Sequence, residues 1–202
     1  MKKSRKIVLG AVVMILVIAM SVAGTIAYLT SKTETVKNTF TIGNVTIKLD
    51  EHKIKDEYAE ELLEDIVLSN EYKLLPGHTY LKDPTVHVHA ESEDCWLFVK
   101  VTNGIAAIEV AAADGDTIAE QMAALGWTLV EGTTDVYAYK ETVSGGADVK
   151  VFDSFTIAGD ADISGYATEN NDSAVIEIIA YAVQADGFTT SAAAWAAAPA
   201  TW

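Results

Sequence analysis

The sequence contains one pair of histidines whose spacing suits a metal ion. His87 and His89 are two residues apart, and alternate residues of a β-strand point to the same face. Both imidazoles could therefore bind one metal ion, and three further residues of ligand type lie nearby in the sequence: His78, Asp83 and Glu91. The alternative is a pair of exposed histidines on the polar face of a half-buried strand. We favour this alternative, because two histidines without a third placed ligand are a weak metal motif.

Other catalytic chemistry has little support in the sequence. The chain lacks the His-Glu-x-x-His zinc motif, the Gly-x-Ser-x-Gly nucleophile motif and a Gly-rich phosphate loop. Its single cysteine, Cys95, begins an apolar segment and is expected to be a small buried residue rather than a reactive thiol. The paired carboxylates Glu60-Glu61 and Glu64-Asp65 belong to an acidic run that we expect to be solvated. The sequence therefore predicts neither an enzyme nor a resident cofactor.

Alternating and apolar segments predict that these residues lie in a mainly β domain. The segments expected to form strands are 38–49, 85–90, 95–102, 127–130, 136–140, 149–158 and 174–185. Segment 174–185 is apolar at both odd and even positions, which is typical of a central strand buried on both faces. The pattern favours an antiparallel β-sandwich, jelly-roll-like, with two or three short inserted helices.

Three segments between or after the strands are candidates for helices. Asp56–Leu68 is expected to be a short amphipathic helix or an ordered acidic loop. A second helix is predicted to begin at an Asp116 cap and to end at Gly126. An Ala-rich helix near the C-terminus is expected to be capped by Thr189 or Thr190.

The N-terminus has the features of a secretory signal. Four of the first six residues are basic, and an uncharged apolar run follows at 7–20. Thr25 and Ala27 place small residues at positions −3 and −1, which predicts cleavage before Tyr28. We therefore expect a signal peptide at 1–27, a flexible arm at 28–37 and a β-sandwich domain at 38–202. The alternative is an uncleaved membrane anchor, because residues 7–29 carry no charge and about 20 such residues span a bilayer.

The charge distribution fits an exported protein. All 29 acidic residues follow Ala27, whereas four of the 14 basic residues precede it, so the mature part carries a net charge of −19. Such a surface repels nucleic acid and anionic lipid, which makes both poor candidates for partners. Membrane contact is then expected only through the N-terminal segment before cleavage. An acidic surface suits solubility, weak divalent-cation binding or the spacing of like charges.

The processing site and first strand resemble a known family. Residues 24–47 join the cleavage site to a Thr-rich segment, to Asn38-Thr39-Phe40 and to a Gly-containing strand. This block resembles the start of the TasA/camelysin family, strongly over residues 20–50. The likeness is fair over 74–102, which contains Pro76-Gly77, and over 174–196.

The resemblance implies a secreted cell-surface or biofilm-matrix protein with a jelly-roll fold that is cut by a SipW-type signal peptidase. It also implies self-assembly into fibres by donor-strand exchange, in which the freed N-terminal arm completes the sheet of another subunit. The family carries a metallopeptidase label, which we do not transfer because the zinc-protease motif is missing. The acidic segment Asp56–Asp65 and the His87/His89 pair do not match the family pattern. A monomeric surface binding or adhesion module therefore stays open as an alternative to a fibre subunit.

Overall fold

A computed structural model describes residues 44–111, 116–166 and 174–198. The chain divides into two units, Met1–Thr41 and Ile42–Trp202, and all described residues belong to the second. The predicted cleavage site at Thr25, Ala27 and Tyr28 and the arm at 28–37 therefore lie outside the described residues. Within those residues, no helix is both long enough and apolar enough to cross a membrane.

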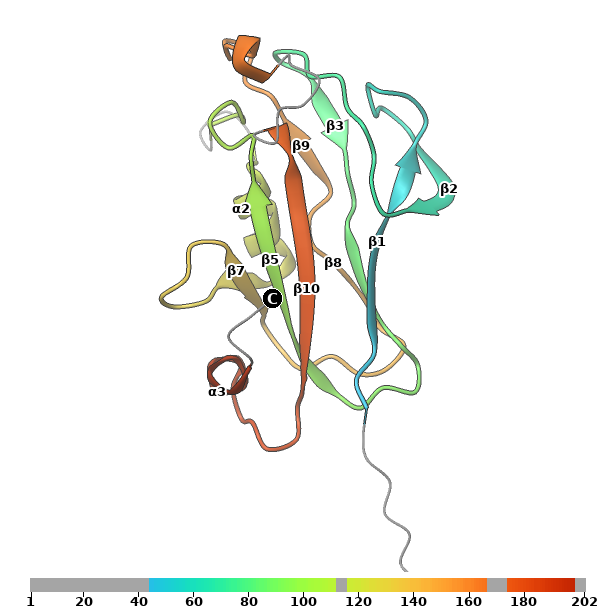
Figure 1. Ribbon diagram of the computed structural model, residues 1–202, viewed down its shortest axis with the longest axis vertical. Coiled ribbons are helices and arrows are strands. Elements are labelled where there is room, and N and C mark those ends of the chain that lie inside the picture. The colour runs from blue at the N-terminus through green and yellow to red at the C-terminus, as the bar shows by residue number, and fades with distance from the viewer. Residues whose placement is uncertain (1–43, 112–115, 167–173, 199–202) are drawn as a thin grey trace, which may run out of the picture. The chain divides into compact units, whose positions relative to one another are not determined.

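The domain is built from antiparallel sheets, as the sequence predicts (Figure 1). The first sheet has the strand order β2-β1-β4-β8 and contains β1 (Ile47–Ile54), β2 (Leu62–Val67), β4 (Thr85–Val88) and β8 (Asp148–Lys150). The second has the order β10-β5-β7-β6 and contains β5 (Cys95–Asn103), β6 (Trp127–Leu129), β7 (Val136–Tyr139) and β10 (Ile176–Gln184). A two-stranded sheet joins β3 (Thr79–Leu81) to β9 (Ser154–Thr156).

Alternating apolar residues on the strands form the main core. Val86 and Val88 of β4 are buried, and so are Leu97 and Val99 of β5, because side chains two residues apart share one face of a strand. The largest fully buried side chains in this core include four aromatic residues: Tyr80, Trp127, Phe152 and Phe155. This arrangement confirms the predicted β-sandwich with short helical inserts.

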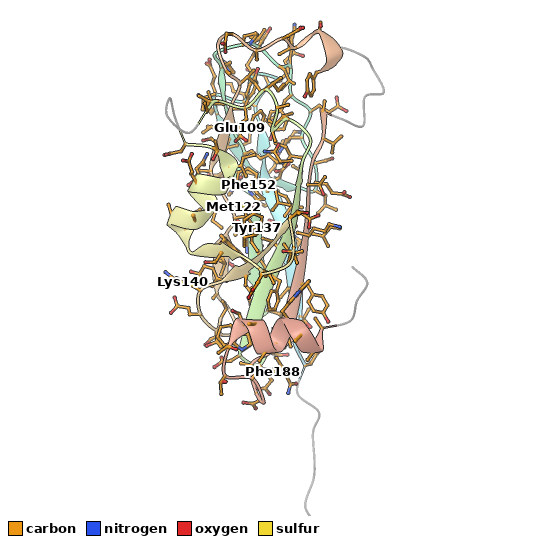
Figure 2. All side chains as sticks on the ribbon, turned by 90° about the vertical axis from the view of Figure 1, so that its left-hand side faces the viewer. Glu109, Met122, Tyr137, Lys140, Phe152 and Phe188 are labelled. Carbon is orange, nitrogen blue, oxygen red and sulfur yellow. The ribbon has the colours of Figure 1, made fainter. Side chains whose placement is uncertain are left out.

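Two α-helices and one 3₁₀ helix, η1 (Ser164–Tyr166), complete the described domain. Helix α2 (Ile118–Leu125) buries Ile118 and Met122 on its inner face (Figure 2). The predicted cap at Asp116 is wrong by one residue. The Thr117 hydroxyl accepts the Glu120 N–H, and the Glu120 carboxylate accepts the Thr117 N–H, which forms a capping box. Gly126 ends the helix with φ 99°, as predicted, in the left-handed region that glycine adopts most readily.

Helix α3 (Ser191–Ala197) begins at Thr190, one of the two predicted caps. It packs on the outer face of β5 and β10, where Ala194 and Phe98 form a second, smaller core. Phe188 precedes the helix and packs against the same cluster (Figure 2). Residues on both faces of β10 are therefore covered over part of its length.

Two predicted segments adopt a different structure. Within Asp56–Leu68, residues Leu62–Val67 form strand β2, because they pair with the second half of β1 instead of completing a helix. The predicted single strand 149–158 is split into β8 and β9, which lie in different sheets. The chain crosses between the sheets at Val151 and Phe152, and both of these side chains are fully buried.

Candidate functional site

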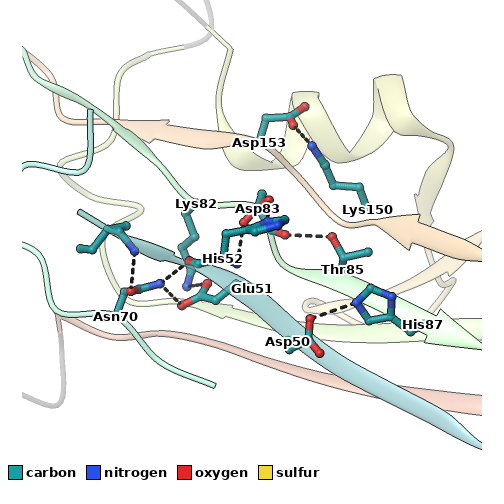
Figure 3. Close-up of polar contacts among 11 residues, drawn as sticks. Asp50, Glu51, His52, Asn70, Lys82, Asp83, Thr85, His87, Lys150 and Asp153 are labelled. Carbon is teal, nitrogen blue, oxygen red and sulfur yellow. Dashed lines mark hydrogen bonds and ion pairs between the residues drawn. The ribbon is translucent and has the colours of Figure 1, made fainter. Parts of the chain in front are cut away.

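His87 is a strand residue with two carboxylate partners. Its Nε2 lies 2.9 Å from Asp50 Oδ1 on β1 (Figure 3). Its Nδ1 lies 2.6 Å from Asp148 Oδ1 on β8. His89 follows the end of β4 and is exposed. In the part of the chain that the structure describes, no three His, Cys, Asp or Glu side chains are arranged to hold a metal ion.

The other residues of ligand type are engaged elsewhere. Asp83 Oδ2 lies 2.7 Å from His52 Nδ1, and the His52 backbone N–H donates to Asp83 Oδ1 at 3.0 Å. His78 Nε2 lies 2.8 Å from the carbonyl oxygen of Tyr58. The Glu91 backbone N–H faces His89 Nδ1 at 3.3 Å. The structure therefore brings no three of these five candidates together.

The surroundings of half-buried His87 shift its own pKa and the pKa of buried Asp50. Burial by itself would lower the pKa of His87, but hydrogen bonds to Asp148 and Asp50 and their negative charges raise it overall. Burial by itself would raise the pKa of Asp50, but hydrogen bonds from Lys48 and His87 lower it overall. Lys48 Nζ lies 2.7 Å from Asp50 Oδ2. The imidazolium and carboxylate forms are thus favoured together.

A second polar cluster, which the sequence patterns do not indicate, lies on the inner side of β1. It consists of Glu51, Lys82 and Asn70 (Figure 3). Glu51 is 5% exposed and Lys82 is 8% exposed, although each carries a charged group. Lys82 Nζ contacts Glu51 Oε2, and Asn70 Nδ2 donates to Glu51 Oε1 at 2.9 Å. These residues come from three segments that are far apart in sequence, so local spacing gives no signal for them.

Cys95 has the environment that the sequence predicts. Its side chain is fully buried at the start of β5. Burial, helped by the negative charge of Asp94, raises the pKa of Cys95 to about 11. The thiol is therefore protonated at neutral pH, which makes it a poor nucleophile.

Strand β10 lies at the edge of its sheet, which corrects the predicted central position of 174–185. It pairs with β5 over its whole length, and no other described strand pairs with it. Its half-buried residues face the main core from one side, and Tyr181 and Val183 contact the α3 cluster on the other. An edge strand covered on both faces has the same apolar pattern as a central strand, which explains the error.

The free edge of β10 presents a regular row of backbone groups. Val175 accepts from Gly104 N–H, and Ala185 donates to the carbonyl oxygen of Asp94, so odd-numbered residues bond toward β5. Because these groups alternate along a strand, five residues direct their N–H and C=O groups away from β5. They are Ile176, Ile178, Ala180, Ala182 and Gln184. Strand β1 runs beside this edge without pairing with it (Figure 1).

Exposed apolar side chains and a cavity adjoin this edge. Leu68 is 82% exposed, Val175 is 49% exposed and Ile179 is 37% exposed. A cavity of about 690 Å³ lies between the segment 68–74 and the start of β10. Its apolar lining includes Tyr72 and Phe155, and its polar lining includes Asn70 and Lys82.

Together, the free strand edge, the exposed apolar residues and the cavity form a surface on which an extended segment could bind. Sequence reasoning assigned the segment 174–185 to a central strand and therefore did not locate this edge. No family model matches the chain, and no curated protein or solved structure matches it significantly.

Proposed function

We propose that the chain is a secreted cell-surface or extracellular-matrix structural protein whose copies assemble by strand addition. In this proposal an extended N-terminal segment of one copy pairs with the free edge of β10 in another. The observation that carries the proposal is the row of outward backbone groups along β10, a nine-residue strand with no second partner among the described strands. Unpaired edges of this kind are templates for an added strand.

The energetics favour an added strand at this position. Each new backbone hydrogen bond contributes about 0.5–1.5 kcal/mol net. The incoming segment would also cover apolar surface, including the exposed side chains of Leu68 and Val175. Both residues line the cavity beside the strand edge, so an apolar side chain of the added segment could fill part of that space.

The N-terminal segment has the composition that strand addition needs. Residues 28–42 contain five threonines together with Tyr28, Val36 and Phe40, and threonine and aromatic residues favour an extended backbone. Cleavage before Tyr28 by a SipW-type signal peptidase would free this segment from the membrane. The resemblance of residues 24–47 to the TasA/camelysin family supports the same assignment and a biofilm-matrix location.

A monomeric surface binding or adhesion module is the second candidate, and the cavity favours it. A cavity of about 690 Å³ falls within the usual size of small-molecule sites. A camelysin-like metallopeptidase has less support, because both ring nitrogens of His87 already contact carboxylates. His87 would have to leave Asp50 or Asp148 before it could bind a metal ion.

The proposal is tested with the mature protein beginning at Tyr28 and two variants. One variant lacks residues 28–37, and the other carries Ala180→Pro. The Ala180 N–H points away from β5, so proline removes an outward donor without breaking a hydrogen bond to β5. We expect filaments from the mature protein in electron microscopy, and monomers from both variants in analytical ultracentrifugation.

Ala180→Val serves as the matched control, because it keeps the N–H and should still assemble. Circular dichroism verifies that every variant is folded. Mature protein that stays monomeric at all concentrations, with added salt or calcium, would contradict the fibre proposal and favour the monomeric module. Filaments of unchanged yield from Ala180→Pro would show that β10 is not the acceptor.

A further inference from the structure

The cluster of Glu51, Lys82 and Asn70 places an amine and a carboxamide against the two oxygens of one buried carboxylate. Lys82 Nζ contacts one oxygen of the Glu51 carboxylate, and Asn70 Nδ2 donates to the other at 2.9 Å (Figure 3). The two nitrogen atoms therefore lie on neighbouring sides of a single carboxylate. Asn70 is held in place by two further bonds, from Ile54 N–H to its Oδ1 at 3.0 Å and from its Nδ2 to His52 O at 2.9 Å.

The cluster lies in a largely apolar setting. Lys82 Nζ is 5.7 Å from the centroid of the Tyr72 ring. That ring makes an edge contact with Phe155, with centroids 5.2 Å apart, and another with the buried Tyr80. Burial among aromatic rings makes an isolated charge costly. A proton passed from the Lys82 ammonium to Glu51 leaves two neutral groups, one of them an amine that can act as a nucleophile.

We propose that Lys82 and Asn70 form an intramolecular isopeptide bond, with Glu51 as the catalytic acid and base. The proposal concerns a covalent modification of this chain and does not depend on whether copies assemble. It follows from the contacts of three side chains that come from β1, from the segment after β2 and from the segment after β3.

The reaction is an exchange of one amide nitrogen for another. Glu51 Oε2 takes a proton from the Lys82 ammonium, and the neutral Nζ attacks Cγ of Asn70 to form a new C–N bond. The Cγ=O electrons move to Oδ1, where the Ile54 N–H stabilises the negative charge.

Once Cγ is tetrahedral, Nδ2 has a lone pair that can accept a proton. Glu51, which Nδ2 contacts, then gives its proton to Nδ2 and accepts the remaining extra proton from Nζ. The carbonyl re-forms as the Cγ–Nδ2 bond breaks, and ammonia leaves. Ammonia takes the proton back from Glu51 and departs as ammonium. The amine and the carboxamide thus become a secondary amide and ammonium, with no oxidant or other reactant.

The surroundings suit each step of this exchange. Asn70 and Lys82 both line the cavity, which gives the released ammonia a path away from the buried cluster. The carboxylate of Glu51 contacts both the attacking and the leaving nitrogen, so one group can transfer protons at both. An ordinary buried ion pair needs only Glu51 and Lys82, whereas here the Asn70 carboxamide faces the same carboxylate.

The test is the intact mass of the purified, folded mature protein, measured at isotopic resolution. We expect the mass to be one ammonia lower than the sequence requires. Proteolysis should then yield a branched peptide in which Asn70 is joined to Lys82. A full, unmodified mass after prolonged incubation of the folded protein would overturn the proposal. A loss of one water would also overturn it, because the bond would then involve a carboxylate.

Variants separate this bond from loss of ammonia elsewhere. Glu51→Gln keeps the shape of the side chain but removes the proton acceptor, and Lys82→Arg keeps the charge but removes the nucleophile. Both should show no loss of ammonia. Lys150→Arg is the control, because this exposed lysine pairs with Asp153 and should leave the mass deficit unchanged. Circular dichroism checks folding. A deficit that persists in Lys82→Arg, or an unbranched peptide that carries it, would contradict the assignment.

Discussion

His87 connects three strands of one sheet through its two ring nitrogens. It projects from β4 and contacts Asp50 on β1 and Asp148 on β8. Lys48 of β1 also reaches Asp50, so each charge in the group faces an opposite charge. The carboxylate of Asp50 is almost fully buried, and it therefore depends on these partners to offset its lost hydration.

The direction of the pKa shifts fixes the pH range in which these contacts stabilise the fold. The pKa of His87 is raised above its usual 6.5, so its contribution is complete below that value and is lost as pH rises through the raised pKa. The pKa of Asp50 is lowered below its usual 3.8, so its contribution is present above that value and is lost on further acidification. Both contributions are present between these two limits.

We expect His87→Gln to reduce the free energy of unfolding by about 1 kcal/mol at about pH 5.5 and by clearly less at about pH 8. Glutamine keeps one hydrogen bond but cannot become positively charged. Chemical denaturation of both proteins at the two pH values measures the difference. His89→Gln is the matched control, and its exposed side chain predicts a change below about 0.5 kcal/mol at either pH. An equal loss for His87→Gln at both pH values would exclude a contribution from its charge.

At the scale of single elements, the capping box distinguishes two neighbouring residues at the start of α2. The side chain of Thr117 receives the Glu120 N–H, whereas Asp116 interacts with the helix only through its backbone carbonyl, which accepts from Gln121 Nε2. Removing the Thr117 hydroxyl leaves helix donors without their partner. Truncating Asp116 leaves its carbonyl, and therefore this hydrogen bond, in place.

We expect Thr117→Ala to lower the free energy of unfolding by about 1 kcal/mol. Asp116→Ala should change it by less than about 0.5 kcal/mol, since its side chain is exposed. Urea denaturation of the two variants side by side makes the comparison. If Asp116→Ala proved the more damaging change, the cap would be at Asp116 after all.

Elements with strong local signals are predictable from this sequence, whereas their place in a sheet is not. The strand at Cys95 and the end of α2 at Gly126 follow from local patterns, and the structure confirms both. Strand β2 has the spacing of a helix, but pairing with β1 decides its conformation. The apolar pattern of β10 indicates only that both faces of the strand are covered by other residues. An edge strand can be covered in this way as well as a central one. Sheet order depends on partners distant in sequence.

At the scale of the whole molecule, the candidate sites were only partly predictable, because their residues also meet partners that are distant in sequence. Glu51 lies 19 residues from Asn70 and 31 from Lys82, so only the folded chain brings them together. The histidine pair is visible in the sequence, but its two carboxylate partners come from β1 and β8. By contrast, net charge is a sum over residues and can be obtained directly from the sequence.

That charge opposes the assembly that we propose. A copy cleaved before Tyr28 would carry −19, so such copies would repel one another as an added strand brings them together. Salt screens this repulsion, because the Debye length falls from about 30 Å at 0.01 M to about 8 Å at 0.15 M ionic strength. Strand addition itself depends on backbone hydrogen bonds and apolar contacts, which salt weakens little. Salt should therefore favour assembly.

We expect the critical concentration for filament formation to fall several-fold between about 0.01 M and about 0.15 M sodium chloride. Sedimentation of the mature protein at a series of concentrations measures it, with sucrose as an uncharged control solute. Calcium chloride at matched ionic strength separates screening by a cation from its binding to carboxylates. A critical concentration lower than in sodium chloride would indicate binding in addition to screening. A critical concentration that rises with sodium chloride would contradict this account. It would mean that attractive ion pairs between copies, rather than strand addition against a background of repulsion, hold the filament together.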